Sequence, residues 1–516
     1  MRMMTEVNSR RWLPVGLFAA AMLPLFATPV LPLIDFYNHL ARFFVLSHID
    51  ASPVLQDFYR SHWTLLPDIG VDVLGTPVLA IVPPMIAGHI IVMGIMAVIY
   101  SGVLYFHHAV TGQRSILVAL LLLPLLYSYI LNWGFANFLL GLGFSFWAAG
   151  WWFLNRSRPF LAVPISCVSA ILIFLTHGLA FALYGILVAS LEIGRFVCAP
   201  VHRPLDLVRS LCLTAIQAII PFAFLAYWLT ASAQAGHIAP PQTFLPQELT
   251  GYPPGLTGRI LRRLVPILRV EEGPSYLFDV ATLFVQALAV GFLFVMGRLK
   301  IASLAWPLLI AAALTVGIGA PTLFGVSYIT DRMPLFALLC FLSVLTVRPG
   351  KWIFASKIAL GVIAVTVAIR LVAVATSWHA YSADYREFQT VAKAIPRGSL
   401  TLGVGVGAAF HETNVPRCEM FGPLLVASYG QAGPLFADPK QQPLGLTGRL
   451  KAAVDSLHAS HPMERPADYA AYMTDAVAAG FDYLLVCNAE RLTQPYPGNT
   501  DLVAQTSHFA LLRAKR

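Results

Sequence analysis

Charged residues are scarce in this chain of 516 residues. They make up 11% of it, whereas a soluble protein carries roughly 25%, and hydrophobic residues make up 58%. This composition excludes an ordinary soluble globular protein. Runs of about 20 apolar residues, each long enough to cross a bilayer, indicate instead a mainly α-helical, polytopic membrane protein.

Signals for several kinds of ligand are also missing. No Lys/Arg cluster alternates with aromatic residues, so the net charge of +9 does not indicate a nucleic-acid surface. The six cysteines form no CxxC motif or Cys/His cluster, so no metal site is predicted and no cofactor is required, although a divalent cation is left open. The segment GVGVG lacks both a Walker lysine and G-x-G-x-x-G spacing, which indicates ordinary strand and turn glycines.

The apolar runs predict about eleven transmembrane helices. The first run is longer than the core of a signal peptide, so we expect an uncleaved helix with Arg2, Arg10 and Arg11 on the inside. The predicted spans lie near residues 12–33, 86–106, 115–131, 135–154, 159–176, 179–197, 207–231, 277–297, 301–320, 333–347 and 357–376.

The stretch Val71–Pro84 decides the predicted topology. It is apolar, but it is short for a span and ends in Pro83-Pro84. If it lies along the outer interface, most Lys and Arg of the short loops fall inside, as the positive-inside rule requires. This arrangement places two long loops, residues 34–85 and 232–276, on the outer side together with the C-terminal tail.

Composition changes at Ser377, which predicts a transmembrane helical domain over residues 1–376 and a soluble extracytoplasmic α/β domain over residues 377–516. The tail twice shows a helix-then-strand pattern, in YREFQTVAKAIP with SLTLGVGVG and in ADYAAYMTDAVAAG with FDYLLVCN. Its end, LVAQTSHFALLRAKR, predicts a closing pair of strands. An oxidising outer compartment would permit a disulfide between Cys418 and Cys487, but the sequence does not fix their distance.

Polar residues of the first outer loop fall on one helical face. Asp35, Asn38, His39 and Arg42 stand at i, i+3, i+4 and i+7, so a helix would bring the four side chains to the same side. The alternative is that Asp35 caps this helix and the others form a solvated face.

Two further candidates lie later in the same loop. His62 is an isolated histidine, and Asp68 stands four residues before Asp72, so these two carboxylates could share a helical face. The alternative for Asp68 is a helix-start signal next to Pro67.

Other candidates lie near the predicted outer ends of spans. His177 stands in a Thr-His-Gly turn and is either a ligand or a satisfied turn residue. Arg332, beside Asp331, could hold a phosphate oxygen or pair locally. Arg262 and Arg263 belong to a basic segment that either orders over a lipid-phosphate substrate or binds anionic lipid without specificity.

The inner face offers fewer ionisable groups. Glu192 and Arg195, at i and i+3, are expected to pair locally, and Arg370 is expected to snorkel outward from the last span. The concentration of ionisable groups near the outer face marks that face as the functional one.

These features resemble bacterial GT-C-type membrane glycosyltransferases, the class that includes family 39 mannosyltransferase-like proteins. The resemblance rests on Asp35 directly after the first span, the following interface helix, and the stretch HWTLLPDIGVDVLGTP with its non-spanning apolar helix. The Pro84–Gly88 entry to the next span and the soluble outer C-terminal domain add to it. It implies transfer of a sugar from a polyprenyl-phosphate carrier to an envelope acceptor at the periplasmic face of the bacterial inner membrane.

In that class an acidic residue of the first outer loop acts as general base or binds the acceptor, and Asp35 matches this position. The resemblance implies that Asp35 is the base and that His39 assists it, while Arg332, Arg42 or a loop arginine holds the phosphate. The other candidates would contribute to substrate or phosphate binding: Asn38, His62, Asp68, His177, Arg262 and Arg263.

Many relatives carry a second acidic residue where this chain has Phe36. This departure favours a first alternative, a catalytically inactive GT-C-like protein of envelope assembly. A lipid-linked sugar transporter is a second alternative, although transporters commonly show internal repeats and polar sites at mid-depth. Neither feature stands out in this sequence.

Overall fold

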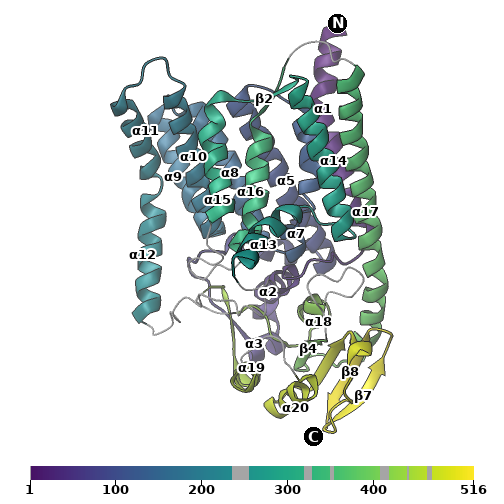
Figure 1. Ribbon diagram of the computed structural model, residues 1–516. Helices are drawn as coiled ribbons and strands as arrows, with labels where there is room; N and C mark the ends of the chain where they lie inside the picture. The colour runs from purple at the N-terminus through teal and green to yellow at the C-terminus, as the bar shows by residue number, and fades with distance from the viewer. Residues whose placement is uncertain are drawn as a thin grey trace. The chain divides into compact units, whose positions relative to one another are not determined.

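The structure, a computed structural model, describes residues 2–234, 255–318, 328–348, 354–406, 418–437, 441–461 and 468–515. Parts of two predicted outer segments, 235–254 and 319–327, lie outside the described residues. The described chain is mainly helical with small β-sheets (Figure 1). It divides into two compact units. Unit 1 comprises Met1–Leu23, Met93–Leu131 and Ala136–Val374, and unit 2 comprises Pro24–Val92, Asn132–Phe135 and Ala375–Arg516.

Unit 1 contains most of the apolar helices. Three helices have residues in both units: α5 (Pro84–Thr111), α7 (Tyr129–Trp133) and α17 (Phe354–Ala392). The helices that lie in unit 1 are α1 (Arg2–Ala21), α6 (Ile116–Leu125), α8 (Ala136–Asn155), α9 (Pro159–Thr176), α10 (Gly178–Val197), α11 (Pro204–Ile216), α12 (Ile219–Gln234), α13 (Gly255–Leu268), α14 (Tyr276–Val295), α15 (Trp306–Ile318) and α16 (Ile329–Ser343). The short strands β2 (Leu299–Ile301) and β3 (Leu345–Val347) pair antiparallel.

Six helices in the described part of the chain are long and apolar enough to cross a membrane: α5, α8, α9, α10, α14 and α17. A seventh span results if α11 and α12, which meet at a bend of 46°, are counted together. These seven coincide with seven of the predicted spans. The other four predicted spans, near 12–33, 115–131, 301–320 and 333–347, contain helices that fall short in length or apolar character, and they remain predictions.

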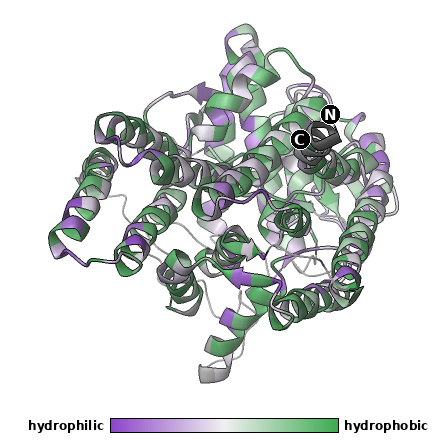
Figure 2. Ribbon diagram, turned by 90° about the horizontal axis from the view of Figure 1, so that it is seen from above, coloured by the Kyte–Doolittle hydropathy of each residue, from purple (hydrophilic) through white to green (hydrophobic). Residues whose placement is uncertain are grey.

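The candidate spans present apolar side chains on their surfaces. Leu277 and Val295 of α14 are exposed by 78% and 85%, and Phe160 of α9 is exposed by 97%. Figure 2 shows hydrophobic residues along most of the helices. Exposed apolar surface of this extent suits contact with lipid chains better than contact with water. Unit 1 is therefore a polytopic helical body of the kind that a bilayer surrounds.

The stretch Val71–Pro84 forms no span. Its helix α4 (Gly70–Leu79), in unit 2, has ten residues. At 1.5 Å per residue it is about 15 Å long, roughly half the thickness of the hydrocarbon core. The next helix, α5, begins at Pro84, where the missing N–H of proline costs no helical hydrogen bond.

The tail in unit 2 has the predicted order of elements. Helix α17 precedes β4 (Thr401–Gly405), α20 (Tyr469–Ala479) precedes β6 (Tyr483–Cys487), and β7 (Thr500–Gln505) pairs antiparallel with β8 (Phe509–Ala514). The four strands form one sheet in the order β4-β6-β8-β7, in which β4 and β6 are parallel. The predicted helix-then-strand pattern is confirmed at both places.

One hydrophobic core joins the tail to the first loop. Val45 of α2 (Phe36–His48) packs in the same buried cluster as Leu400 and Val426 of the tail. The loop strand β1 (Tyr59–Ser61) pairs antiparallel with the tail strand β5 (Leu444–Leu446). Other elements of this unit are α3 (Pro53–Phe58), α18 (Phe421–Tyr429) and α19 (Gly448–Ser460). The first loop and the tail therefore fold together.

Cys418 and Cys487 form a disulfide, which the sequence left open. Their Cα atoms are 5.6 Å apart, although 69 residues separate them along the chain. Cys487 is the last residue of β6, so the bond ties the sheet to the segment that leads into α18. Among the described residues Cys167, Cys198, Cys212 and Cys340 are free.

The predicted outward snorkelling of Arg370 is wrong. Its side chain is 1% exposed within unit 1, and its Nε lies 3.0 Å from Glu271 Oε2. Its Nη1 donates a hydrogen bond to Asp279 Oδ1 at 3.1 Å and another to the Thr282 hydroxyl. The two buried carboxylates compensate the positive charge of the buried guanidinium, so the side chain of Arg370 is stable without contact with water.

Candidate functional site

Asp35 stands immediately before α2. It occupies the position of a helix cap, but its side chain makes no capping hydrogen bond to the first turn. Its backbone carbonyl accepts a hydrogen bond from the N–H of Asn38 at 3.0 Å. The alternative interpretation, in which the carboxylate caps the helix, is therefore wrong.

The turn around Gly134, also in unit 2, holds the backbone of Asp35. The N–H of Asp35 donates a hydrogen bond to the carbonyl of Trp133 at 2.9 Å. Gly134 has φ +83°, and a Cβ built on it would lie 2.3 Å from the backbone nitrogen of Phe36. Only glycine fits this conformation and this close approach. The position of the Asp35 backbone thus depends on a turn that is distant in sequence.

Arg42 lies one helical turn beyond His39 and is completely buried. Its Nε and Nη2 donate hydrogen bonds to both carboxylate oxygens of Asp72 at 2.5 and 3.0 Å. Its Nη1 donates to the carbonyl of Phe436 at 3.2 Å, and Nη2 also lies 2.8 Å from Nδ1 of His39. Burial raises the pKa of Asp72, and the adjacent guanidinium opposes this shift. Because each guanidinium nitrogen has a protein partner, the geometry favours a positioning role for Arg42 over phosphate binding.

Arg42 also determines the tautomer and the protonation state of His39. A guanidinium can only donate, so Nδ1 of His39 accepts and the ring proton resides on Nε2. Burial, followed by the positive charge of Arg42, lowers the pKa of His39 well below its usual value. His39 is therefore neutral near pH 7 and suits hydrogen-bond donation through Nε2 better than proton abstraction.

A second group of candidates, His177 and Arg332, lies in unit 1 where three helices begin. His177 is the N-cap residue of α10, and Arg332 stands in the first turn of α16. Both contact Phe138 in the first turn of α8, with its ring centroid 5.4 Å from that of His177 and 5.1 Å from the guanidinium carbon of Arg332. The helices α8, α10 and α16 can be followed in Figure 1. Helix N-termini carry partial positive charge, so this location favours an anion.

The single ring proton of His177 cannot satisfy both of its contacts. Its Nδ1 accepts a hydrogen bond from the N–H of Leu179 at 3.1 Å, so a neutral ring carries its proton on Nε2. Burial, followed by the charge of Arg332, lowers the pKa of His177 well below its usual value and keeps the ring neutral. Nε2 lies 2.8 Å from Nη1 of Arg332, which is also a donor. An acceptor oxygen near both nitrogens would receive a hydrogen bond from each.

The remaining predicted residues lie in less enclosed positions, apart from Asn38, which is buried in the first turn of α2. His62 is exposed just after β1, and its N–H donates to the carbonyl of Pro443. Asp68 has φ +69° in the turn before α4. Arg262 and Arg263 stand on α13, and Arg263 Nη1 donates to the carbonyl of Val316 at 3.4 Å.

The structure thus groups the candidates within each unit: Asp35, Asn38, His39 and Arg42 around α2 in unit 2, and His177 with Arg332 in unit 1. The prediction that Asp35, His39, His177 and Arg332 converge on one pocket involves both units and stays a prediction. The described residues contain no group of three or more His, Cys, Asp or Glu that could hold a metal ion.

Sequence reasoning missed the partner of Arg42. From the sequence, Asp72 was considered only as a neighbour of Asp68 on a helical face. The available signal was a carboxylate inside the apolar run VDVLGTPVLAIV, because a buried carboxylate requires a cation or several hydrogen bonds. The same signal was available for Asp279, four residues into the apolar helix α14.

No protein-family model matches this chain, and no curated protein matches it. A solved structure does match: "Crystal Structure of ArnT from Cupriavidus metallidurans bound to Undecaprenyl phosphate". The two chains are 12% identical, the match covers 96% of this chain and 97% of that one, and the TM-score is 0.49. A likeness at this level carries no argument about this chain, so its function has to be inferred from its own residues.

Proposed function

We propose that this chain is a membrane glycosyltransferase that moves a sugar from a polyprenyl-phosphate carrier to an envelope acceptor at the extracytoplasmic face. The proposal depends chiefly on one observation. Arg332 and neutral His177 direct two hydrogen-bond donors toward each other at 2.8 Å, at the N-terminus of α10. A phosphate oxygen is an acceptor that both can bind.

The surroundings of these donors suit a lipid phosphate. Arg332 and His177 are 6% and 5% exposed, so their charge and dipoles act in a medium of low dielectric constant. His177 stands at the end of the apolar helix α10, with Arg332 beside it, where a carrier's phosphate would lie at the interface and its hydrocarbon chain among the lipids. Inorganic phosphate, which has no hydrocarbon chain, would gain no binding energy from these apolar surroundings.

The proposed reaction is an inverting displacement. The acceptor hydroxyl oxygen forms a bond to the anomeric carbon, the bond from that carbon to the carrier phosphate breaks, and the hydroxyl proton passes to a base. Asp35, at the N-cap position of α2, is the proposed base. His39 would orient a substrate group by donating from Nε2.

The disulfide supports the proposed location of the tail. Disulfides persist in oxidising compartments, and a bacterial periplasm is one of them. An inner-membrane protein whose C-terminal tail lies outside agrees with this chemistry and with the positive-inside rule.

Replacement of the proposed base tests the function. Asp35→Asn in proteoliposomes supplied with a sugar-loaded polyprenyl phosphate should lower transfer by about a hundredfold or more, because a general base typically contributes that much. Asp50→Asn removes an exposed carboxylate from the same unit and should leave transfer unchanged. Full activity of Asp35→Asn would remove Asp35 from the mechanism. Movement of the carrier across the vesicle without sugar transfer would favour a transporter.

Binding of the carrier tests the phosphate site separately. Arg332→Gln should weaken binding of polyprenyl phosphate by roughly tenfold or more, as expected for loss of a charge-assisted hydrogen bond. Arg114→Gln removes an exposed arginine of unit 1 and serves as the control. Equal affinities for the two variants would place the carrier phosphate elsewhere.

A further inference from the structure

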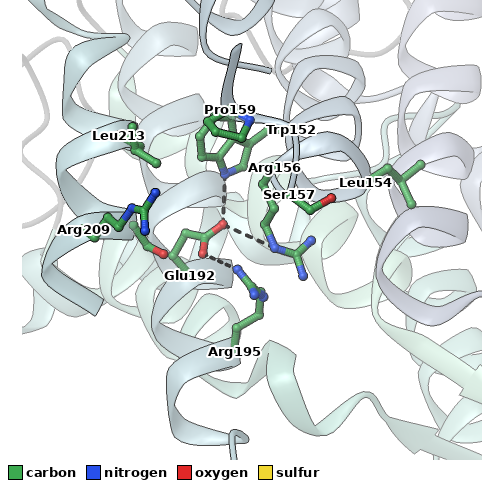
Figure 3. Close-up of a pocket in the computed structure, with 10 residues that line it drawn as sticks. Trp152, Leu154, Arg156, Ser157, Pro159, Glu192, Arg195, Arg209 and Leu213 are labelled. Atoms are coloured by element: carbon green, nitrogen blue, oxygen red, sulfur yellow. Dashed lines mark hydrogen bonds and ion pairs between the residues drawn. The ribbon is translucent and has the colours of Figure 1, made fainter. Parts of the chain in front are cut away.

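A polar cavity lies at the opposite ends of α8 and α10 from the His177 site. Because α8, α9, α10 and α11 follow one another through short connections, the α8–α9 and α10–α11 connections fall at the same end of these helices. The cavity has a volume of about 390 Å³ and is lined by Trp152, Arg156, Ser157, Glu192, Arg195 and Arg209, among others (Figure 3). We call it the arginine pocket.

Glu192 organises the pocket. It is 2% exposed, and it accepts hydrogen bonds from Trp152 Nε1 at 2.9 Å and from Arg195 Nη1 at 2.7 Å. Arg156 Nε lies 3.9 Å from Oε1 of Glu192, too far for a hydrogen bond. The predicted Glu192–Arg195 pair is confirmed, but it is part of a larger cluster.

The pocket carries more positive than negative charge. Arg156, Arg195 and Arg209 contribute three positive charges and Glu192 one negative charge, so the lining has a net charge of +2. Within the described residues Arg209 has no hydrogen bond or ion pair, and the buried Nε of Arg156 has no hydrogen-bond partner. Burial, followed by the charge of Arg195, lowers the pKa of Arg156. These guanidinium groups are therefore short of anionic partners.

We propose that the arginine pocket binds the phosphate of an anionic phospholipid headgroup. Guanidinium groups match phosphate geometry, and basic pockets between membrane helices recognise such headgroups. Apolar side chains border the pocket: Leu154 is 48% exposed, and Phe160, next to the lining residue Pro159, is 97% exposed. A free phosphate would use only the charges, whereas a phospholipid uses the charges and places its acyl chains on this apolar surface.

A bound headgroup would join α8, α10 and α11. Its phosphate would bridge Arg156 after α8, Arg195 in the last turn of α10 and Arg209 of α11, beside the first residue of α9. The positive-inside rule assigns this end of the helices to the cytoplasmic face. The site is therefore separate from the proposed sugar transfer and would stabilise the helices rather than act on substrate.

The full chain, purified in neutral detergent, allows a direct test. Titration with phosphatidylglycerol should raise its melting temperature in a saturable manner, while phosphatidylcholine and inorganic phosphate should not. Arg209→Gln should raise the apparent Kd for phosphatidylglycerol about fivefold, the usual effect of one basic residue at a lipid surface. Because Arg209 has no partner among the described residues, this variant should fold normally.

Arg203→Gln is the matched control. Arg203 is exposed just before α11 and does not line the pocket, so its loss removes the same charge close to Arg209 without changing the site. Its Kd should equal that of the unchanged protein. An equal loss of affinity in both variants would show that binding is a non-specific surface effect and overturn the proposal. Stabilisation by inorganic phosphate at similar concentrations would also overturn it, since a lipid would then not be required.

Discussion

At the scale of single residues, backbone contacts hold Asp35 independently of its side chain. A hydrogen bond to Trp133 and the close packing of Gly134 against Phe36 fix the start of α2. The sequence alone indicates a carboxylate at the beginning of a helix. It does not indicate the supporting turn, because Gly134 is far away along the chain and resembles any other glycine between two apolar runs.

Alanine at Gly134 should displace Asp35 and reduce sugar transfer. A residue with a Cβ in the left-handed region costs about 1–2 kcal/mol, and the approach of 2.3 Å to Phe36 adds a clash that only backbone movement can relieve. Gly112→Ala is the matched control, because Gly112 has φ +69° but nothing within 4 Å of its Cβ position. Thermal melting and transfer rates should show a larger loss for Gly134→Ala. Equal losses would contradict a supporting role for the turn.

At the scale of elements, buried ion pairs join helices that the sequence shows only as separate segments. Arg42 and Asp72 tie α2 to α4, and Arg370 ties α17 to Glu271 and to Asp279 of α14. Helical periodicity predicts that Asn38, His39 and Arg42 share a face, since this depends only on neighbours along the chain. The partners of Arg42 and Arg370 depend on tertiary packing, so the sequence suggested a phosphate ligand for one and a snorkelling side chain for the other.

Single and double replacements should separate two effects on the free energy of unfolding: the loss caused by removing one partner of a buried ion pair, and the net contribution of the Arg42–Asp72 pair. Asp72→Leu leaves a buried guanidinium without its carboxylate and should destabilise the fold by about 3–5 kcal/mol. Arg42→Met with Asp72→Leu removes both charges and should recover much of that loss. Chemical unfolding in detergent measures both effects. A double variant less stable than the single one would show that the pair itself stabilises the junction of α2 and α4.

Glu271 should make stability depend on pH. Burial raises its pKa to about 7, while Arg370 favours the charged form and Asp279 opposes it. Glu271 therefore binds a proton more tightly in the folded state than in the unfolded state. Its protonation contributes fully to the free energy of unfolding below about pH 4.5, and this contribution is lost as the pH rises through 7. Glu271→Gln should flatten the melting temperature across this window. Asp206→Asn, at an exposed position of α11, should leave the slope unchanged. An identical slope in Glu271→Gln would contradict the raised pKa.

At the scale of the whole molecule, the sequence predicts most of the helices and strands but not which segments fold together. Seven spans could be predicted because a bilayer demands about 20 apolar residues in one run, which is a local property. The strands and helices of the tail follow equally local patterns. The shared core of residues around α2 and the tail could not be predicted, because Val45 and Leu400 are ordinary apolar residues whose contact depends on the fold.

The disulfide offers a test of the compartment of the tail and of its stability. In a variant without the free cysteines Cys167, Cys198, Cys212 and Cys340, Cys418 and Cys487 should react with a maleimide only after reduction and unfolding, because the oxidised thiols are bonded and buried. Labelling without reductant would indicate a reducing compartment and contradict an extracytoplasmic tail.

Loss of the bond should also weaken the sheet. Cys418→Ser with Cys487→Ser frees a loop of 69 residues and should lower the free energy of unfolding of unit 2 by about 2–5 kcal/mol. Cys198→Ser removes an exposed, free thiol and should have no measurable effect. Since α2 shares its core with the tail, the double variant should also lower transfer through Asp35 as temperature rises. Transfer that stays constant while the tail melts would show that α2 holds its position without the tail.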